Sequence, residues 1–259
     1  LVTAPLPFTS ADGESAAAAV LGAASDRTRI ALIDHITSPT ALILPVKRLV
    51  EALEARGIDT LVDGAHAPGM VPLALSELNA AYYTGNAHKW LCAPKGAAFL
   101  HVRRDRQAGL HPNIISHGYA SGFHAEFDWT GTSDPTPWLC IPESIRYMRG
   151  LLPGGWNGIM AANHALVVEA RRILLRSLEV DAPCPESMIG SMASIPLPAQ
   201  AARRGLDPKA LHDRLRERGV EAWLHPYPVP LLRLSAQLYN EIGQYEKLAR
   251  LIEEALRDR

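Results

Sequence analysis

The sequence predicts an α/β fold with a mostly parallel central sheet in a large domain, followed by a small C-terminal α+β domain. Four short apolar runs lie between residues 30 and 102, and amphipathic or turn-rich segments separate them. This alternation is typical of strands joined by helical crossovers. Beyond residue 150, one long helical segment precedes further apolar runs and helical segments. We therefore place the large domain at residues 1–150 and the small domain at residues 151–259.

The first apolar run, residues 30–33 (IALI), is typical of a buried strand. A helix begins at Pro45, because proline is favoured in the first turn, and Gly57 ends it. The next strand, residues 60–62, carries Asp63 at its C-terminal end. The helix between the two strands places four apolar side chains on one face: Val46, Leu49, Val50 and Leu53.

Residues 73–78 form a short predicted helix, and residues 80–83 (AAYY) form the third strand. The fourth strand covers residues 97–102, after a turn at residues 94–96 (PKG). Residues 103–137 are rich in Gly, His, Asp, Pro and Ser and show no periodicity. A loop of this length inside a compact domain is usually functional, so we expect it to line a site or an interface.

The C-terminal part of the chain predicts a small α+β domain. Its elements in chain order are a helix at 156–179, a strand at 188–195, a helix at 208–218, and strands at 220–224 and 231–235. A last helix follows, and its apolar side consists of Leu248, Leu251, Ile252 and Ala255.

The composition is that of a soluble globular protein with small-molecule chemistry. The 259 residues are 47% hydrophobic and 20% charged, and 26 basic against 27 acidic side chains give a net charge of −1. This balance argues against a nucleic acid or an anionic membrane as partner. No apolar run reaches the roughly 18 residues that span a bilayer. We expect a cytoplasmic protein, and because the chain begins without methionine we expect it to be the remainder of a longer one.

Cysteines and histidines give no sign of a metal site or a disulfide framework. The three cysteines are far apart and lack a Cys-x-x-Cys spacing. The histidines do not follow a ligand spacing either, so we expect no metal at His101, His111, His117 or His124.

Residues 83–90 (YTGNAHKW) carry the strongest chemical signal, because residues 63–66 (DGAH) precede them by about one β/α unit. A lysine that forms a Schiff base must supply a neutral amine, which favours a shielded strand end beside polar or cationic groups. Lys89 fits that setting. Taken alone, Asp63 is more often a turn residue and a lysine is more often a surface residue, but the linked pattern predicts a pyridoxal phosphate site.

The pattern extends further along the chain. Residues 62–69 (VDGAHAPG), 84–89 (TGNAHK), 94–96 (PKG), 127–136 (FDWTGTSDPT) and 232–235 (LRLS) together resemble the class V aminotransferase-fold enzymes. Within them the chain is most similar to the isopenicillin N epimerase-like branch, which is related to the cysteine desulfurases. The resemblance implies the type I fold of pyridoxal 5′-phosphate-dependent transferases.

The resemblance implies a role for each residue around the cofactor. Lys89 would form the Schiff base, Asp63 would pair with the pyridine nitrogen, and His66 would reach the phenolic oxygen. These three residues would be catalytic. Asn86 and His88 would contact the cofactor phosphate.

Four further residues complete the implied site. Thr37 and Ser38 stand where relatives touch an oxygen of the cofactor. Thr132, which follows Gly131, would reach the cofactor phosphate of the neighbouring subunit and so implies a homodimer. Arg233 matches the arginine that holds the α-carboxylate of an amino-acid substrate, since guanidinium binds a carboxylate through two parallel hydrogen bonds. Relatives also use a ring-stacking residue and a phosphate-binding helix that lie upstream of the residues recorded here.

The reaction is open between three readings. An amino-acid epimerase or aminotransferase-like activity ranks first. A cysteine desulfurase-like activity or C–S lyase on a cysteine conjugate is the enzyme alternative, although Cys184, between two prolines, stands poorly for persulfide transfer. The third reading is a non-catalytic dimer that retains the fold without the cofactor.

Overall fold

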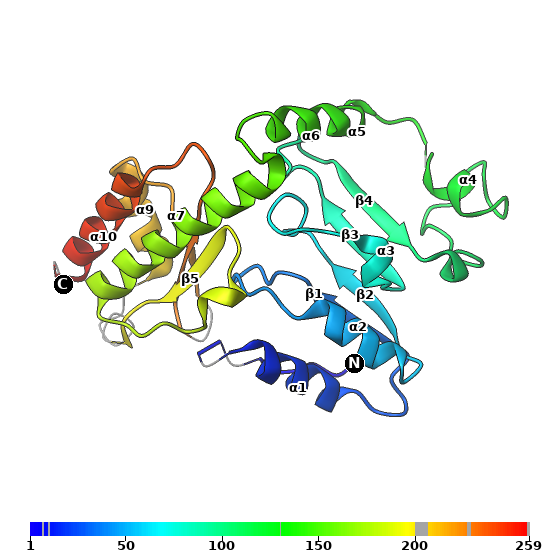
Figure 1. Cartoon of the computed structure of the whole chain (residues 1–259), viewed down its shortest axis with the longest axis horizontal. Helices are drawn as coiled ribbons and strands as arrows, with labels where there is room; N and C mark the ends of the chain where they lie inside the picture. Colours follow the sequence, from blue (N-terminus) through cyan, green and yellow to red (C-terminus); the bar gives the residue numbers. More distant parts are fainter. Residues whose placement is uncertain (7, 10, 130, 200–206, 227–228, 258–259) are drawn as a thin grey trace. The chain divides into compact units, whose positions relative to one another are not determined.

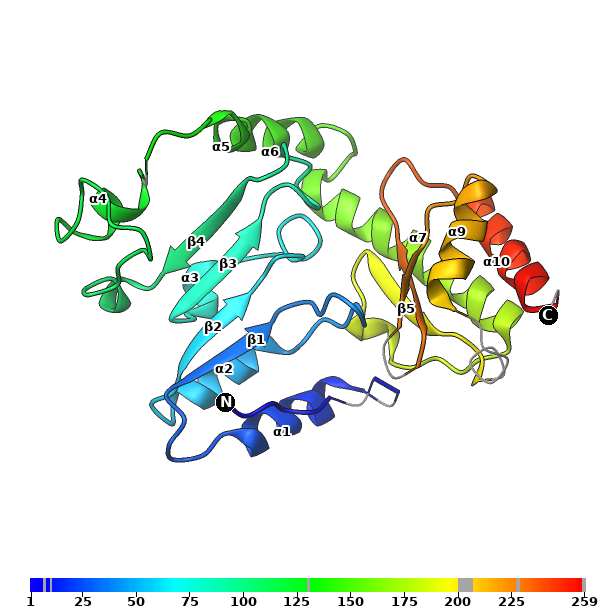
Figure 2. The same cartoon turned by 180° about the vertical axis from the view of Figure 1, so that it is seen from behind.

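The computed structural model describes every residue except 7, 10, 130, 200–206, 227–228 and 258–259. Its contacts divide the chain into two compact units, whose elements can be followed in Figures 1 and 2. Unit 1 comprises Leu1–Ala23, Ile36–Pro45 and Leu151–Arg259, and unit 2 comprises Ala24–His35 and Val46–Gly150.

Two N-terminal segments therefore group differently from the predicted division at residue 150. Residues 36–45 contact the C-terminal part of the chain: the Ile43 amide donates to the Met188 carbonyl at 2.8 Å, and the Ser194 hydroxyl donates to the Pro39 carbonyl at 2.8 Å. These hydrogen bonds join the loop to unit 1.

Unit 2 contains a four-stranded sheet in the order β1-β2-β3-β4. The first three strands are parallel and β4 is antiparallel to β3, so the sheet is mostly parallel as predicted. The strands are β1 (Ile30–Asp34), β2 (Asp59–Asp63), β3 (Tyr82–Asn86) and β4 (Ala98–Val102).

Helix α2 (Val46–Glu54) packs on β1 and β2 and buries the four predicted side chains, Val46, Leu49, Val50 and Leu53. The prediction that β1 is fully buried is wrong, because Ile30 and Leu32 are 53% and 72% exposed. Successive strand residues point to opposite faces, and α2 covers only the face on which Ile33 lies.

Strand β3 begins two residues later than predicted and runs through Asn86. Its last two residues pair with β4, Gly85 with Phe99 and Asn86 with Ala98. The short α3 (Leu75–Leu78) lies between β2 and β3, as expected. The general expectation of helical crossovers does not hold between β3 and β4, where a loop that includes the predicted turn at residues 94–96 connects the strands. The Ala87 amide donates to the Ala97 carbonyl across this loop at 3.0 Å.

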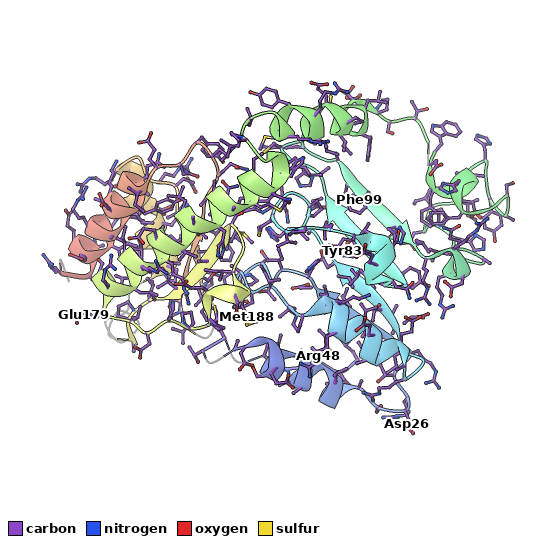
Figure 3. All side chains as sticks on the ribbon, in the orientation of Figure 1. Asp26, Arg48, Tyr83, Phe99, Glu179 and Met188 are labelled. Carbon is purple, nitrogen blue, oxygen red and sulfur yellow. The ribbon has the colours of Figure 1, made fainter. Side chains whose placement is uncertain are left out.

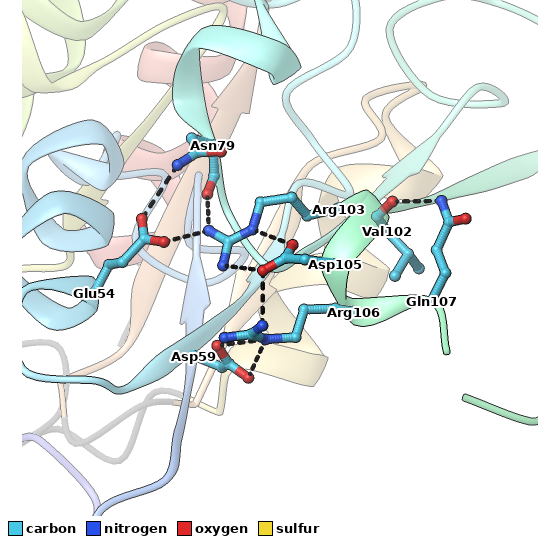
Figure 4. Close-up of polar contacts among 8 residues, drawn as sticks. All are labelled: Glu54, Asp59, Asn79, Val102, Arg103, Asp105, Arg106 and Gln107. Atoms are coloured by element: carbon cyan, nitrogen blue, oxygen red, sulfur yellow. Dashed lines mark hydrogen bonds and ion pairs between the residues drawn. The ribbon is translucent and has the colours of Figure 1, made fainter. Parts of the chain in front are cut away.

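The segment after β4 is tied to α2 and β2 by ion pairs (Figure 4). Arg103 Nη1 lies 2.5 Å from Glu54 Oε1, and Arg103 Nε lies 2.7 Å from Asp105 Oδ1. Arg106 bridges Asp105 at 2.7 Å and Asp59, at the start of β2, at 2.9 Å. The network fixes the beginning of the long segment that was predicted to be a loop.

That segment contains more regular structure than its composition indicated. It holds a 3₁₀ turn η1 (Arg104–Arg106) and a helix α4 (Phe123–Phe127), and α5 (Thr136–Leu139) begins at its end. Helix α6 (Ile141–Arg149), which follows, was not predicted.

Unit 1 contains an antiparallel sheet in the order β5-β7-β6, beside long helices. Helix α7 (Gly155–Leu178) packs against α10 (Ile242–Arg257) and β5 (Met192–Pro196). All four residues predicted for the apolar side of α10 are buried. The remaining described elements are α1 (Gly13–Ala23), η2 (Glu186–Met188), α9 (Pro208–Glu217), β6 (Trp223–His225) and β7 (Leu231–Ser235).

Among the described residues, no helix combines the length and the apolar character needed to cross a membrane.

Candidate active site

The C-terminal ends of β2 and β3 bring the central site residues of unit 2 together. Asp63 ends β2, Asn86 ends β3, and Lys89 follows three residues later. The Nζ of Lys89 lies 3.3 Å from Nε2 of His66. The Asp63 carboxylate accepts a hydrogen bond from the Ala65 amide at 2.9 Å, which holds the side chain at the strand end. Ligands of open α/β sheets bind at this edge.

The turn after Asp63 has no room for a side chain at Gly64. A Cβ there would lie 2.2 Å from the hydroxyl oxygen of Tyr83. The Gly64 amide donates to the Thr84 carbonyl of β3 at 2.8 Å, and the Ala67 amide donates back to the Gly64 carbonyl at 2.9 Å. The glycine therefore lets the backbone lie against β3 and carry His66 to Lys89.

Under this strand end lies a buried polar pair that sequence reasoning missed. The Nδ1 of His35 and the hydroxyl of Tyr83 are 2.9 Å apart, and the Tyr83 ring stacks on Phe99 at 6.3 Å. Figure 3 labels Tyr83 and Phe99 on the sheet of unit 2. Burial lowers the pKa of His35 to about 4, so the imidazole that hydrogen-bonds the phenol is neutral at neutral pH. Burial, and then the charge of Asp63, raise the pKa of Tyr83.

The same pair supports the strand that ends in Asp63. The His35 amide donates to the Asp63 carbonyl at 2.8 Å. Strand alternation places residue 83 on the face that α2 covers, but no local signal relates it to residue 35, which is 48 positions away.

A second carboxylate stands beside Asp63. Asp34 is its register partner on the parallel strand β1, which puts both side chains on one face of the sheet. Burial, and then the charge of Asp63, raise the pKa of Asp34. The two carboxylates together favour a positive charge at this strand end, such as a protonated ring nitrogen.

The loop that carries Lys89 is held by backbone contacts. The Nδ1 of His88 donates to the Ala97 carbonyl at 3.0 Å, and Nε2 takes no part in this hydrogen bond. The Cys92 amide donates to the Lys89 carbonyl at 3.2 Å, and the Ala93 amide donates to the Ala87 carbonyl at 3.0 Å. Within the described part of the chain no hydrogen bond of the Asn86 side chain indicates its role, so the phosphate contacts of Asn86 and His88 stay predictions.

Thr132 lies in another part of unit 2. An open hollow of about 410 Å³ is lined by Ile115, Ser116, His117, Trp129, Gly131 and Thr132. The rings of His117 and Trp129 stack there at 5.9 Å. The role of Thr132 toward a second subunit stays a prediction.

Unit 1 carries the other predicted residues. The Thr37 hydroxyl accepts from the Leu42 amide at 2.9 Å, so it holds its own loop. The Nη1 of Arg233 donates to the carbonyl of Ser38 at 2.7 Å and to its hydroxyl at 3.1 Å. The structure thus brings Ser38 and Arg233 together in unit 1, and Asp63, His66 and Lys89 together in unit 2.

The residues of unit 2 fit pyridoxal phosphate by their chemistry. A primary amine can form a Schiff base, a carboxylate can keep a pyridine nitrogen protonated, and an imidazole can contact a phenolic oxygen. Within the described residues, Lys89 and His66 are in direct contact and Asp63 stands at the adjacent strand end. Fold and site define a pyridoxal phosphate-binding α/β protein of the transferase type.

Residues 6–174 match the family model Aminotransferase class-V, and the chain belongs to this family. Pyridoxal 5′-phosphate is the cofactor of the family. The family and the fold predicted from the sequence are thereby confirmed.

Curated relatives are longer than this chain. It is 32% identical to "Putative L-cysteine desulfhydrase 1" of Oryza sativa subsp. japonica, over 100% of this chain and 59% of the relative. It is 37% identical to "Isopenicillin N epimerase" of Streptomyces clavuligerus, over 96% of this chain and 66% of the relative. The chain therefore spans about three fifths to two thirds of these proteins.

Solved structures share the fold at low sequence identity. A cysteine desulfurase of Thermococcus onnurineus NA1 superimposes with a TM-score of 0.78 at 19% identity, over 98% of this chain and 65% of that one. A cystine C–S lyase in complex with cysteine persulfide gives a TM-score of 0.78 at 19% identity, over 95% and 66%.

Proposed function

We propose that the full-length protein is a pyridoxal phosphate-dependent enzyme that acts at the Cα of an amino acid or amino-acid derivative, as an epimerase or aminotransferase-like enzyme. The observation that carries the proposal is the 3.3 Å contact between Lys89 Nζ and His66 Nε2 beside the Asp63 strand end. The identity to isopenicillin N epimerase supports the first-ranked reaction.

The roles of the unit 2 residues follow from their chemistry. When bound, the cofactor withdraws electrons from the Cα of an attached amino acid and so weakens the bonds to that carbon. Asp63 would keep the ring nitrogen protonated, with Asp34 adding negative potential at the same strand end. Lys89 would hold the cofactor through its amine, and the same amine would act as the base and acid for the proton at Cα. His66, whose Nε2 lies 3.3 Å from that amine, would contact the phenolic oxygen.

Arg233 would bind the substrate α-carboxylate. Its guanidinium is half-buried, and its acceptors among the described residues, the carbonyl and hydroxyl oxygens of Ser38, are neutral. The positive charge is thus left for a substrate carboxylate. A carboxylate bound in this way would restrict the orientation of the amino acid.

A sulfide-releasing C–S lyase is the second candidate, because several relatives carry the name L-cysteine desulfhydrase. A desulfurase that stores sulfur on a cysteine is less well supported. Cys184 is 6% exposed, and burial raises the pKa of its thiol more than nearby Arg171 lowers it. A buried neutral thiol is a poor sulfur acceptor.

Solvent deuterium distinguishes these reactions in the full-length protein. Incubation of candidate amino acids in D₂O should place deuterium at Cα with loss of optical rotation for an epimerase. Sulfide with pyruvate from L-cysteine would instead establish the lyase, and amino transfer to a keto acid would establish a transaminase. Absence of all three, in protein that binds the cofactor, would overturn the proposal.

We also propose a cytoplasmic homodimer in which Thr132 reaches the cofactor phosphate of the other subunit. Mixed dimers test this arrangement. We expect dimers of Lys89→Ala alone and of Thr132→Val alone to be inactive. A mixed dimer has one site in which an intact Lys89 meets an intact Thr132. Because random mixing makes half of the dimers mixed, the mixture should regain up to half of one site's activity per dimer on average. No recovery would place Thr132 at its own subunit's site or at none.

A further inference from the structure

Arg233 stacks on the indole ring of Trp223. Its guanidinium carbon lies 4.2 Å from the ring centroid. The two residues are register partners on the antiparallel strands β6 and β7, so their side chains share one face of the sheet. The ring of His225, two residues along β6, stacks on the same indole at 4.9 Å.

The other contacts of Arg233 leave its charge unmatched. Nη1 donates to two oxygens of Ser38, while Nε is buried and has no hydrogen-bond partner among the described residues. In the part of the chain that the structure describes, no carboxylate forms an ion pair with Arg233. Burial accordingly lowers the pKa of the guanidinium. One face of the Arg233 guanidinium lies on the Trp223 ring, and its Nη1 is hydrogen-bonded to Ser38.

We propose that Trp223 is a positioning residue for substrate recognition: its indole fixes the plane of the Arg233 guanidinium so that the free donors meet a substrate α-carboxylate. This rests on the proposed role of Arg233. A long arginine side chain loses rotamer freedom when it binds, and a stacked ring removes part of that freedom beforehand. The same ring stabilises the cation without supplying a competing carboxylate.

The test measures binding of two matched probes to the cofactor-loaded, full-length protein. L-alanine and ethylamine both offer a primary amine, but only L-alanine has a carboxylate. Titrations followed by the change in cofactor absorbance give the preference for L-alanine over ethylamine. The variants are Trp223→Leu and Trp223→Phe, with Trp138→Leu as the control that removes a 45% exposed indole elsewhere.

Trp223→Leu lacks the cation–π contact, so it should bind L-alanine roughly 3- to 30-fold more weakly than the wild type and bind ethylamine equally well. The preference of Trp223→Phe for L-alanine should lie between those of Trp223→Leu and the wild type, and the preference of Trp138→Leu should match that of the wild type. Equal losses for both probes, or an unchanged preference in Trp223→Leu with normal circular dichroism, would overturn the proposal. A wild type that binds neither probe would instead contradict the proposed function, and a wild type without preference would remove Arg233 as the carboxylate ligand and Trp223 with it.

Discussion

The Nδ1 of His35 and the hydroxyl of Tyr83 lie 2.9 Å apart in the interior of unit 2, directly below the strand that ends in Asp63. Tyr83 is fully buried and His35 is 8% exposed. Burial of the ring disfavours its charged form, so protonation of His35 would place a charge in this interior. The supporting layer of the site therefore depends on pH.

His35 should make the protein less stable in mild acid. Its pKa is about 4 when folded against an ordinary 6.5, so its contribution to stability is complete above pH 6.5 and is lost as the pH falls toward 4. Between pH 7.5 and 5, the wild type should lose about 2 kcal/mol more unfolding free energy than His35→Gln, whose amide can hydrogen-bond the Tyr83 hydroxyl but does not titrate. Urea unfolding at the two pH values measures this. Parallel pH dependence of the two proteins would contradict a buried neutral His35.

Gly64→Ala should destabilise the strand end on which Asp63 lies. The added methyl would lie 2.2 Å from the Tyr83 hydroxyl. Overpacking of this kind costs about 1–3 kcal/mol, and the shift of Tyr83 should also weaken cofactor binding. Gly243→Ala is the control, because a Cβ there meets no atom within 4 Å. Thermal unfolding of both variants compares them, and equal melting temperatures would show that the turn tolerates a side chain.

Arg103→Met should lower stability more than the loss of an ordinary surface ion pair. The Arg103 side chain is 18% exposed and bonds Glu54, Asp105 and a backbone carbonyl (Figure 4). We expect a loss of about 1–2 kcal/mol, because the largely shielded Arg103 guanidinium makes charge-assisted hydrogen bonds to two carboxylates and one carbonyl at once. Arg146→Met, at 73% exposure, should cost less than about 0.5 kcal/mol. Denaturant titration would contradict the account if the two losses were the same.

Arg233→Lys should impair substrate binding while preserving the fold. A lysine keeps the charge but cannot form two parallel hydrogen bonds with a carboxylate. Losing such a charged contact, at about 1.5–3 kcal/mol, should raise KM roughly 10- to 100-fold with a smaller change in kcat. Ser38→Ala, which keeps the carbonyl acceptor of Arg233, is the milder comparison. Steady-state kinetics with the amino-acid substrate decides, and an unchanged KM in Arg233→Lys would exclude this residue as the carboxylate ligand.

Much of the fold was predictable from local pattern. The apolar stripe of α2 and the apolar side of α10 follow helical periodicity, and the structure buries both. Strand β3 was placed too early because Gly85 and Asn86 are typical of turns, and only pairing with β4 keeps them in the sheet. Helix α1 was missed because its run of alanines carries no amphipathic period. Helix α6, with Pro142 in its first turn, was missed as well.

The site was predictable in its residue types but not in its contacts. The linked motifs around Asp63 and Lys89 indicated the cofactor through their resemblance to a family. The contact of Lys89 with His66 joins residues 23 positions apart, and the stack of Arg233 on Trp223 depends on strand register. Neither register nor loop path can be obtained from periodicity alone.

The central claim is that Lys89 holds pyridoxal phosphate. The most direct measurement is the visible spectrum of the full-length protein after addition of the cofactor, followed by borohydride reduction and peptide mapping, in the wild type and in Lys89→Ala. We expect a visible band in the wild type, and reduction should attach the cofactor irreversibly to the peptide that contains Lys89. The variant should show neither the band nor a peptide labelled with the cofactor. A colourless wild type after reconstitution, or label on another lysine, would contradict the account and favour a dimer that has kept the fold without the cofactor.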